Sequence, residues 1–586
     1  MPDQGSYWTK VLSGRVTRRR AIRAAGAGAA AAAFIAACGG DDDDAPSSGG
    51  SGGGAGGGAT PAGGGSPAAS GDPKAGGKLV WQGYGDIGGT VDLIGIIEYG
   101  TRQFSGLTHD GLLETKSGLP DVPGTSKELQ PLLAAAMPEV SPDKLSYTMK
   151  LKDAKFHDGT DVTAEDVKWS FETYARGERS AWPPLFFWLD SVEATDAKTV
   201  VIKTKFPYAD AMQGMAVQGL GAGDILSRAF QEGPDADKRL MGSGPFIFDS
   251  YSPPTLATFK RNPDYHTQPY PFVDEIERTG DADVEKKIAD IIGGNVNLSY
   301  WVDEPARDRI VAARSDLQLT TYNAAAARVT MRTDKAPWND ERVRRALSMA
   351  IDRDAIIEAV TQGEGQKDQY LSWTGEFWKF RHPEELGENA KYWEHNPGEA
   401  LKLMQATGLE LPIKATANHW NPTVIGPAFV DQFTLIKSNW KNAGIADIQS
   451  IEGTHTQINQ GPFIGNYDDM FWFPNVVGGQ AQIGLFLNLF LSFGGREPGP
   501  PTLNEGYLQD PDLDALIAAQ TGEFDFDARV EVFRQMEDLL ASKQYHVTNI
   551  TWTNNWFMDP KLKGFKPGQE AYNGAMPYLK YAYFDA

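Results

Sequence analysis

Hydrophobic and polar residues alternate from residue 145 to residue 152, where polar side chains separate Tyr147, Met149 and Leu151. A period of two residues is typical of a strand with one buried face. An Asp-Gly pair follows, and Gly159 favours a tight turn because glycine accepts a left-handed backbone without strain. We predict a strand and a turn here, with His157 as a hydrogen-bonding partner within the turn.

After the turn, the hydrophobic period becomes that of a helix. Thr163 is predicted to cap this helix, and Asp166 lies at the third helical position, as in a capping box. Val167, Phe171 and Tyr174 are spaced at i, i+4 and i+7, so they share one face and are expected to pack inward. The pattern therefore predicts a strand–turn–helix corner with a structural rather than a chemical role.

The order of residues within this corner resembles a known family. Residues 154–160 read AKFHDGT and residues 162–167 read VTAEDV. This stretch resembles the signature region of extracellular solute-binding proteins of the oligopeptide, dipeptide and nickel type, which supply ABC importers. Asp161 stands where that family usually has proline. The resemblance implies that the corner belongs to the scaffold of the protein and does not touch the ligand.

Later segments resemble the same family in the same order, so the resemblance covers about residues 78–586. They read MGSGPF at 241–246, RNPDY at 261–265, PFVDEI at 271–276, PWNDERVRRAL at 337–347, AIDR at 350–353 and KGF at 563–565. Within the fourth segment, Asn339 is expected to cap a helix whose apolar face includes Val343 and Leu347. The arginines at 342, 344 and 345 are then expected to face solvent.

Residues 1–37 are predicted to be a signal peptide. Arg18 and Arg19 lie in a segment similar to the twin-arginine export motif, and a mildly hydrophobic run of alanine and glycine follows. Cys38 ends the sequence IAAC, which resembles a lipobox and would make Cys38 the lipid-bearing residue of an anchored protein. The alternative is an ordinary signal peptide with a coincidental cysteine.

Residues 38–77 are predicted to be a disordered tether. They consist largely of glycine, serine, alanine, proline and aspartate, and such a segment cannot bury a core. A flexible chain of about 40 residues spans roughly 30–40 Å. A folded body could therefore work above a membrane while staying attached to it.

Composition and charge exclude several classes of function. The chain has 586 residues, a formal charge of −22 and a single cysteine. The acidic balance argues against a nucleic-acid partner, and one cysteine permits neither an intramolecular disulfide nor a cysteine metal cluster. The sequence has no nucleophile elbow, zinc helix or phosphate-binding loop, and its eight histidines are scattered. No catalytic residue, metal or cofactor is expected.

The chain is too long for a single core. The resemblance implies an α/β fold of the large two-lobe periplasmic-binding-protein type, with three subdomains and a ligand cleft between the lobes. We expect the first lobe at residues 78–325, the second lobe at 326–549 and a return to the first lobe at 550–586. A monomer is expected.

By resemblance, candidate ligand-binding residues lie in three segments, at 84–86, 300–301 and 471–475. Trp182 and Trp420 are two further candidates. Most are aromatic, so core packing is the alternative role for each: Tyr84, Asp86, Trp182, Tyr300, Trp301, Trp420, Phe471, Trp472, Phe473 and Asn475. His419 and His455 could also face the cleft, although a hydrogen-bonded surface histidine is the simpler expectation.

One departure from the family bears on the ligand. Peptide-binding relatives place an aspartate after the strand that begins near Tyr467, where it pairs with the peptide amine. Residues 471–479 of this chain contain no acidic residue. Because a buried ammonium without a carboxylate is costly, we predict a ligand whose buried end is neutral or aromatic. An oligosaccharide, a capped peptide or another amphiphile would fit.

The implied function is that of an exported receptor, anchored by lipid at the outer face of the cytoplasmic membrane. It would close on a small-molecule or peptide-like ligand and deliver it to an ABC permease and its ATPase. Two alternatives stay open, which are a ligand-sensing lipoprotein without a transporter and a secreted hydrolase.

Overall fold

The computed structural model describes residues 73–83, 90–95, 99–116, 118–119, 122, 128–217, 223–280, 283–372, 378–475, 483–492, 498, 502–504, 506–567 and 576–585. Contacts divide the chain into two units, Met1–Gly71 and Asp72–Ala586, and the described residues all lie in the second. Among the described helices, we find none with the length and hydrophobicity that a membrane span requires.

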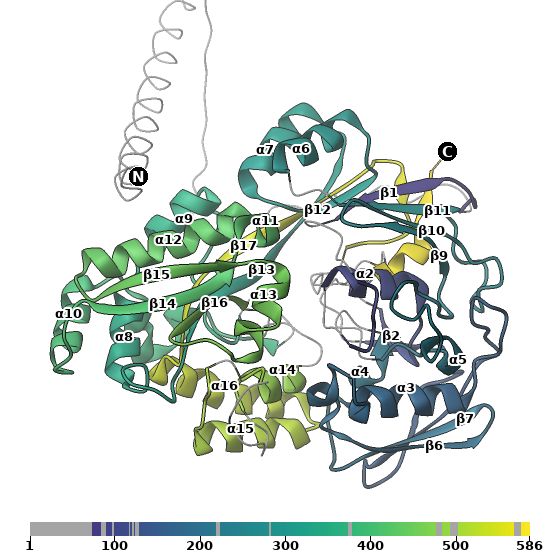
Figure 1. The fold of residues 1–586 in the computed structure, drawn as a ribbon, viewed down its shortest axis with the longest axis horizontal. Helices are drawn as coiled ribbons and strands as arrows, with labels where there is room; N and C mark the ends of the chain where they lie inside the picture. The colour runs from purple at the N-terminus through teal and green to yellow at the C-terminus, as the bar shows by residue number, and fades with distance from the viewer. Residues whose placement is uncertain are drawn as a thin grey trace, which may run out of the picture. The chain divides into compact units, whose positions relative to one another are not determined.

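A ten-stranded mixed sheet runs through this unit (Figure 1). In order of hydrogen-bonded neighbours, its strands are β15 (Ala446–Gly453), β14 (Ile413–Trp420), β16 (Met470–Asn475), β13 (Gln318–Met331), β17 (His546–Met558), β12 (Leu298–Val302), β1 (Lys78–Gln82), β11 (Glu275–Thr279), β10 (Leu256–Arg261) and β9 (Phe246–Ser252). Strand β14 is parallel to β15 and β16, and β1 is parallel to β11 and β12. Helices cover the strands, so the expected α/β fold class is confirmed.

Two long strands, β13 with 14 residues and β17 with 13, pair antiparallel at the centre of the sheet. Strand β13 also pairs with β16, and β17 also pairs with β12, so together they connect the two halves of the sheet. Their register shifts between Asn323 and Ala326, which marks a bulge. The chain is expected to cross between lobes after residue 325, which lies in β13, and after residue 549, which lies in β17. These lobe boundaries stay predictions.

The half of the sheet that contains β1 and β12 is covered on both faces. Helices α6 (Val284–Gly293) and α7 (Glu304–Ala313) pack on one face, where Ile310 joins Phe557 and Val80. Helix α2 (Tyr99–Thr108) contributes Phe104 to a larger cluster that includes Leu79. Because Leu79 and Val80 are neighbours in β1, their side chains point to opposite faces of the sheet.

The other half of the sheet has its own core. Four helices contribute most of its side chains, and Leu347, Phe433 and Trp440 pack there with Val329 of β13. These helices are α8 (Glu341–Met349), α9 (Arg353–Thr361), α10 (Pro397–Gln405) and α12 (Pro427–Asn442). The chain continues through α14 (Ile483–Phe490), α15 (Pro511–Gly522) and α16 (Phe526–Lys543). Short elements complete this part: α11 (Pro422–Ile425), α13 (His455–Asn459), η3 (Pro383–Glu385), η4 (Gly387–Trp393) and η5 (Pro462–Ile464).

Three small sheets and several short helices complete the described fold. The strands, in their order within each small sheet, are β4 (Glu139–Val140), β5 (Ser146–Lys150), β7 (Thr199–Thr204) and β6 (Leu189–Asp196); β3 (Leu129–Pro131), β2 (Leu113–Thr115) and β8 (Ala216–Val217); and β18 (Leu562–Lys563) with β19 (Tyr583–Phe584). The helices are α3 (Ala164–Arg176), α4 (Ala211–Gly214), α5 (Arg228–Gln231), η1 (Pro183–Phe186) and η6 (Met576–Tyr581).

The corner from β5 to α3 forms as predicted. Gly159 has a φ of +87°, in the left-handed region. Thr163 caps α3, and its backbone N–H donates to the Asp166 carboxylate at 2.9 Å, which completes the capping box. The His157 ring donates from Nε2 to the Gly244 carbonyl at 3.0 Å, and Phe171 is fully buried.

Two expectations about α8 are wrong. The N-cap is Asp340 rather than Asn339, because it is the Asp340 carboxylate that accepts from the Arg342 N–H at 2.9 Å. Arg344 does not face solvent either. It is buried, and its guanidinium donates to the backbone carbonyls of Trp338 and Lys543. These carbonyls accept the hydrogen bonds that the guanidinium would make to water if it were exposed.

Candidate ligand-binding site

Part of the predicted site falls outside the described residues. For Trp301 on β12 and Asn475 at the end of β16, only the backbone is described. The predicted residues that lie outside the described part of the chain altogether are Arg18, Arg19, Cys38, Tyr84 and Asp86.

Tyr300 lies in the middle of an aromatic stack formed by three neighbouring strands. Its ring centroid is 4.5 Å from that of Trp556 on β17 and 6.3 Å from that of Trp81 on β1. The Tyr300 hydroxyl accepts a hydrogen bond from the Gln103 side-chain amide on α2. Strands β1 and β12 are parallel, and ligands of open α/β sheets bind at the carboxyl ends of such strands.

Two buried cations lie against this first aromatic group. The Arg278 guanidinium is 5.4 Å from the Trp81 ring centroid and donates to the Thr279 carbonyl at 2.7 Å. The Lys287 ammonium donates to the Tyr300 carbonyl at 2.5 Å. Both cations therefore help to hold the stack in place.

Strand β16 directs its aromatic side chains to opposite faces of the sheet. Trp472 belongs to the core formed by α8 to α12, where its ring lies 5.3 Å from that of Phe433 and its Nε1 donates to the Phe429 carbonyl. Phe471 and Phe473 belong instead to the contiguous cluster that contains the first aromatic group. Trp472 therefore packs as a core residue, whereas its two neighbours face the other side.

Trp420 joins Phe471 and Phe473 in a second aromatic group. Trp420 ends β14, which is parallel to β16, and its ring centroid lies 5.4 Å from that of Phe471 and 5.7 Å from that of Phe473. Phe463 lies 5.7 Å from Phe473 on the same side. Three of the predicted ligand-binding residues are thus brought together.

Arg328 is buried beside this second group. Its guanidinium carbon lies 4.6 Å from the Phe473 ring, 5.0 Å from the Tyr370 ring and 5.7 Å from the Phe490 ring. Its Nε donates to the Thr330 hydroxyl at 3.3 Å. A guanidinium over aromatic faces is held by cation–π attraction, which is stronger when water is excluded.

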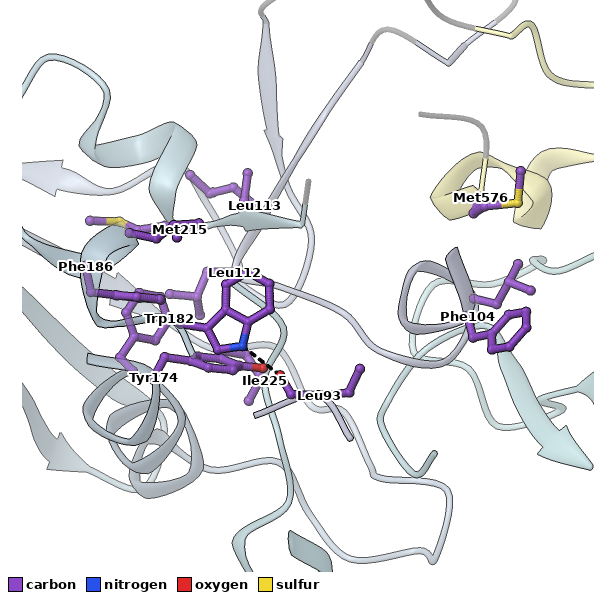
Figure 2. Close-up of a cluster of buried hydrophobic side chains, with 14 of the residues drawn as sticks. Leu93, Phe104, Leu112, Leu113, Tyr174, Trp182, Phe186, Met215, Ile225 and Met576 are labelled. Carbon is purple, nitrogen blue, oxygen red and sulfur yellow. Dashed lines mark hydrogen bonds between the residues drawn. The ribbon is translucent and has the colours of Figure 1, made fainter. Parts of the chain in front are cut away.

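Trp182 lies apart from both aromatic groups. Its Nε1 donates to the Leu93 carbonyl at 2.9 Å, and its ring meets that of Tyr174 edge-on (Figure 2). Figure 2 shows Leu112 and Phe186 gathered around it. Trp182 is buried and its indole N–H is paired with a backbone carbonyl, so it packs here as a core residue of the region around α3 and η1.

The two histidines named above have structural partners. His419 is buried rather than on the surface, and it donates from Nδ1 to the Trp420 carbonyl at 2.8 Å. Burial lowers the pKa of His419 and that of His455, whose Nε2 accepts from the Asn459 amide. Among the described residues, no group of three or more His, Cys, Asp or Glu could hold a metal ion.

Several residues in or beside the two aromatic groups were not predicted from the sequence, among them Trp81, Trp556, Gln103 and Arg328. The spacing of Leu79 and Trp81, with one residue between them, is a signal that could have indicated Trp81. Arg328 gave no such signal, because a charged residue in a strand is ordinarily read as facing solvent.

The sequence of this chain matches a known protein family. The model of the bacterial extracellular solute-binding proteins, family 5 Middle, matches residues 128–480, which is more than half of the chain. The chain belongs to this family. Family-5 proteins are binding proteins of ABC transporters and not enzymes, which removes the hydrolase alternative. This family-5 protein is therefore an extracytoplasmic binding protein.

A curated relative and two solved structures are similar to this family-5 protein. A putative ABC transporter peptide-binding protein of Brucella ovis is 30% identical over 230 residues, which cover 38% of this chain and 43% of the relative. The chain thus matches less than half of that relative's length. The structure of DppA of Helicobacter pylori, in complex with the peptide STSA, matches with a TM-score of 0.74 at 18% identity. The match covers 88% of this chain and 99% of the DppA chain. The structure of AgaA of A. tumefaciens R10, in complex with agropinic acid, matches with a TM-score of 0.74 at 20% identity. This match covers 87% of this chain and 99% of the AgaA chain. These likenesses confirm the two-lobe periplasmic-binding-protein fold.

Proposed function

We propose that this family-5 protein is a membrane-anchored, monomeric receptor that captures a ligand by lobe closure and delivers it to an ABC permease and ATPase. The observation that carries the proposal is the pair of aromatic groups. Trp81, Tyr300 and Trp556 belong to the predicted first lobe, and Trp420 and Phe473 belong to the predicted second lobe. Flat rings on both lobes suit a ligand that is covered from two sides when the lobes approach each other.

The proposed ligand is peptide-like or amphiphilic, with a neutral or aromatic buried end. The names of the similar proteins support this range, because one complex contains a peptide and another contains agropinic acid. The absence of an acidic residue from 471–479 disfavours a free peptide amine. Buried arginines beside both aromatic groups add hydrogen-bond donors to the same cluster.

Mass spectrometry of the small molecules retained by the natively purified protein tests this proposal directly. Calorimetry then compares an N-acetylated peptide with the same peptide carrying a free amine. We expect the acetylated form to bind more tightly, because its end needs no carboxylate partner. Tight binding of ordinary dipeptides or tripeptides would overturn the ligand prediction.

A variant at the second aromatic group tests the position of the site. We expect Phe473→Ala to lower the affinity for the retained ligand by about tenfold or more, since buried aromatic anchors dominate binding. Tyr270→Ala is the matched control, because Tyr270 is half-buried and packs on Phe272 and Tyr581 away from both aromatic groups. Equal affinities in the two variants would place the site elsewhere.

A further inference from the structure

The Asp210 carboxylate accepts hydrogen bonds from elements far from it in the sequence. Asp210 is the N-cap residue of α4, yet its side chain does not cap that helix. It instead accepts from the Gly484 N–H at 2.9 Å, at the start of α14, and from both terminal nitrogens of Arg529 at 2.7 Å each. Asp210 thus caps a helix of another part of the fold and forms a two-pronged ion pair with α16.

The Arg529 guanidinium is satisfied on its other edge as well. Gln520 accepts from Arg529 Nε at 3.2 Å and from Nη2 at 2.7 Å, and the Trp378 ring centroid lies 4.8 Å from the guanidinium carbon. The exposed fractions of the Arg529 and Asp210 side chains are 6% and 2%. Burial alone would lower the pKa of Arg529, but the charge and hydrogen bonds of Asp210 raise it above the usual value.

Two more contacts join the same surfaces. The Ala209 N–H, next to Asp210, donates to the Thr521 carbonyl at 2.9 Å. The Lys144 ammonium lies 3.7 Å from the ring centroid of Phe524. Figure 1 shows α4 beside α14 and α15 where these contacts occur. Residues 144, 209 and 210 belong to the predicted first lobe, and residues 484, 521, 524 and 529 belong to the predicted second lobe.

The energetics of this ion pair depend on the lobes being together. A buried charge that loses its partner is strongly unfavourable, whereas a well-paired buried charge is tolerated. If the lobes separate, Asp210 loses Arg529, and Arg529 keeps only the partners of its own lobe, Gln520 and Trp378. The pair therefore adds little to the stability of either lobe, but it selects one register in which the lobes meet.

We propose that Asp210 and Arg529 form a latch that holds the two lobes closed, away from both aromatic groups. This inference rests on the lobe closure of the proposed function. It goes further because it assigns part of the closing free energy to residues that do not contact the ligand. Any ligand that closes the lobes gains from the same latch, so the pair sets the affinity without setting the specificity.

The test uses the full chain without added ligand. We compare the parent protein with Asp210→Asn and Arg529→Lys by small-angle X-ray scattering and by amide hydrogen exchange. Both variants are expected to have a larger radius of gyration. Exchange at Ala209 and Gly484 should become about tenfold faster or more, because these two amides are protected by the closed contacts. Unchanged exchange in α3 shows that each variant is folded.

Glu285→Gln is the matched control. Glu285 forms a similar two-pronged pair with Arg309 at 2.7 Å, but this pair is exposed and joins α6 to α7 within the predicted first lobe. We expect it to change neither measurement. The latch is refuted if Asp210→Asn and Arg529→Lys both behave like this control. If the two variants open as expected but the parent protein retains no small molecule, the proposed function alone is contradicted.

Discussion

His546 is buried at the start of β17, with its ring centroid 4.7 Å from that of Tyr370. Its Nδ1 lies 3.1 Å from the Thr330 hydroxyl. Burial lowers the pKa of His546 well below the usual value, and the positive charges of Arg328 and Arg344 lower it further. The folded protein therefore keeps His546 neutral at pH values at which the unfolded chain binds a proton.

This difference makes stability depend on pH. The contribution of His546 is complete above its unfolded pKa of about 6.5 and is lost as the pH falls below that value. Between about pH 6.5 and about pH 5, we expect the free energy of unfolding to fall more steeply in the parent than in His546→Gln, by up to about 1.4 kcal/mol per pH unit. Urea unfolding at several pH values measures both slopes, and equal slopes would contradict the expectation.

Single residues were predictable where neighbours in the sequence determine their role. Thr163 pairs with Asp166, three residues away, so spacing alone indicated the cap. A structural role was also expected for His157, but its partner, the Gly244 carbonyl, lies 87 positions away and was not predictable. The faces of Trp472 and Phe473 depend instead on which strands flank β16, and the sequence does not specify that pairing. The burial of Arg328 likewise depends on rings from other elements, Phe490 and Tyr370.

The capping box of α3 is an element whose stability can be tested alone. In Thr163→Ala the Asp166 N–H loses its side-chain acceptor, and we expect the free energy of unfolding to fall by about 1 kcal/mol. The shift of the urea midpoint measures it. Thr456→Ala is the control, because Thr456 is exposed within α13 and caps no helix. A midpoint shift no larger than that of the control would argue against the cap.

Elements with strong periodicity and clear caps were predicted well, and their boundaries less well. The strand expected at residues 145–152 is β5 (Ser146–Lys150), which is shorter at both ends. In α8 the cap is one residue later than expected. That segment has two adjacent cap formers, Asn339 and Asp340, and only the backbone direction at the helix entry decides between them.

At the scale of the whole molecule, the lipid anchor is the simplest prediction to test. We expect Cys38→Ala to move the protein from the membrane fraction to the soluble fraction, because the acyl chains would have no attachment site. Fractionation with immunodetection measures this, and Gly39→Ala serves as the neighbouring control. Retention of the Cys38→Ala protein on membranes would refute lipid attachment at this residue.

The fold class was predictable from the order of short segments across most of the chain, and the family match confirms it. The contacts between segments that are distant in the sequence were not predictable. Asp210 and Arg529 are 319 positions apart in the sequence, and neither lies in a recognisable pattern. The same holds for the stack of Trp81 on Tyr300 and Trp556, which needs three strands that are distant in the chain.

The place of β17 in the sheet has a consequence for synthesis on the ribosome. This strand, at His546–Met558, hydrogen-bonds to β13 and β12, so the middle of the sheet stays open until translation has passed residue 558. The nascent chain thus exposes an unpaired edge on each of these strands from the completion of β13 at Met331 until β17 has been made. A product truncated before residue 546 would contain nearly all of the helices and still lack the strand that joins the two halves of the sheet.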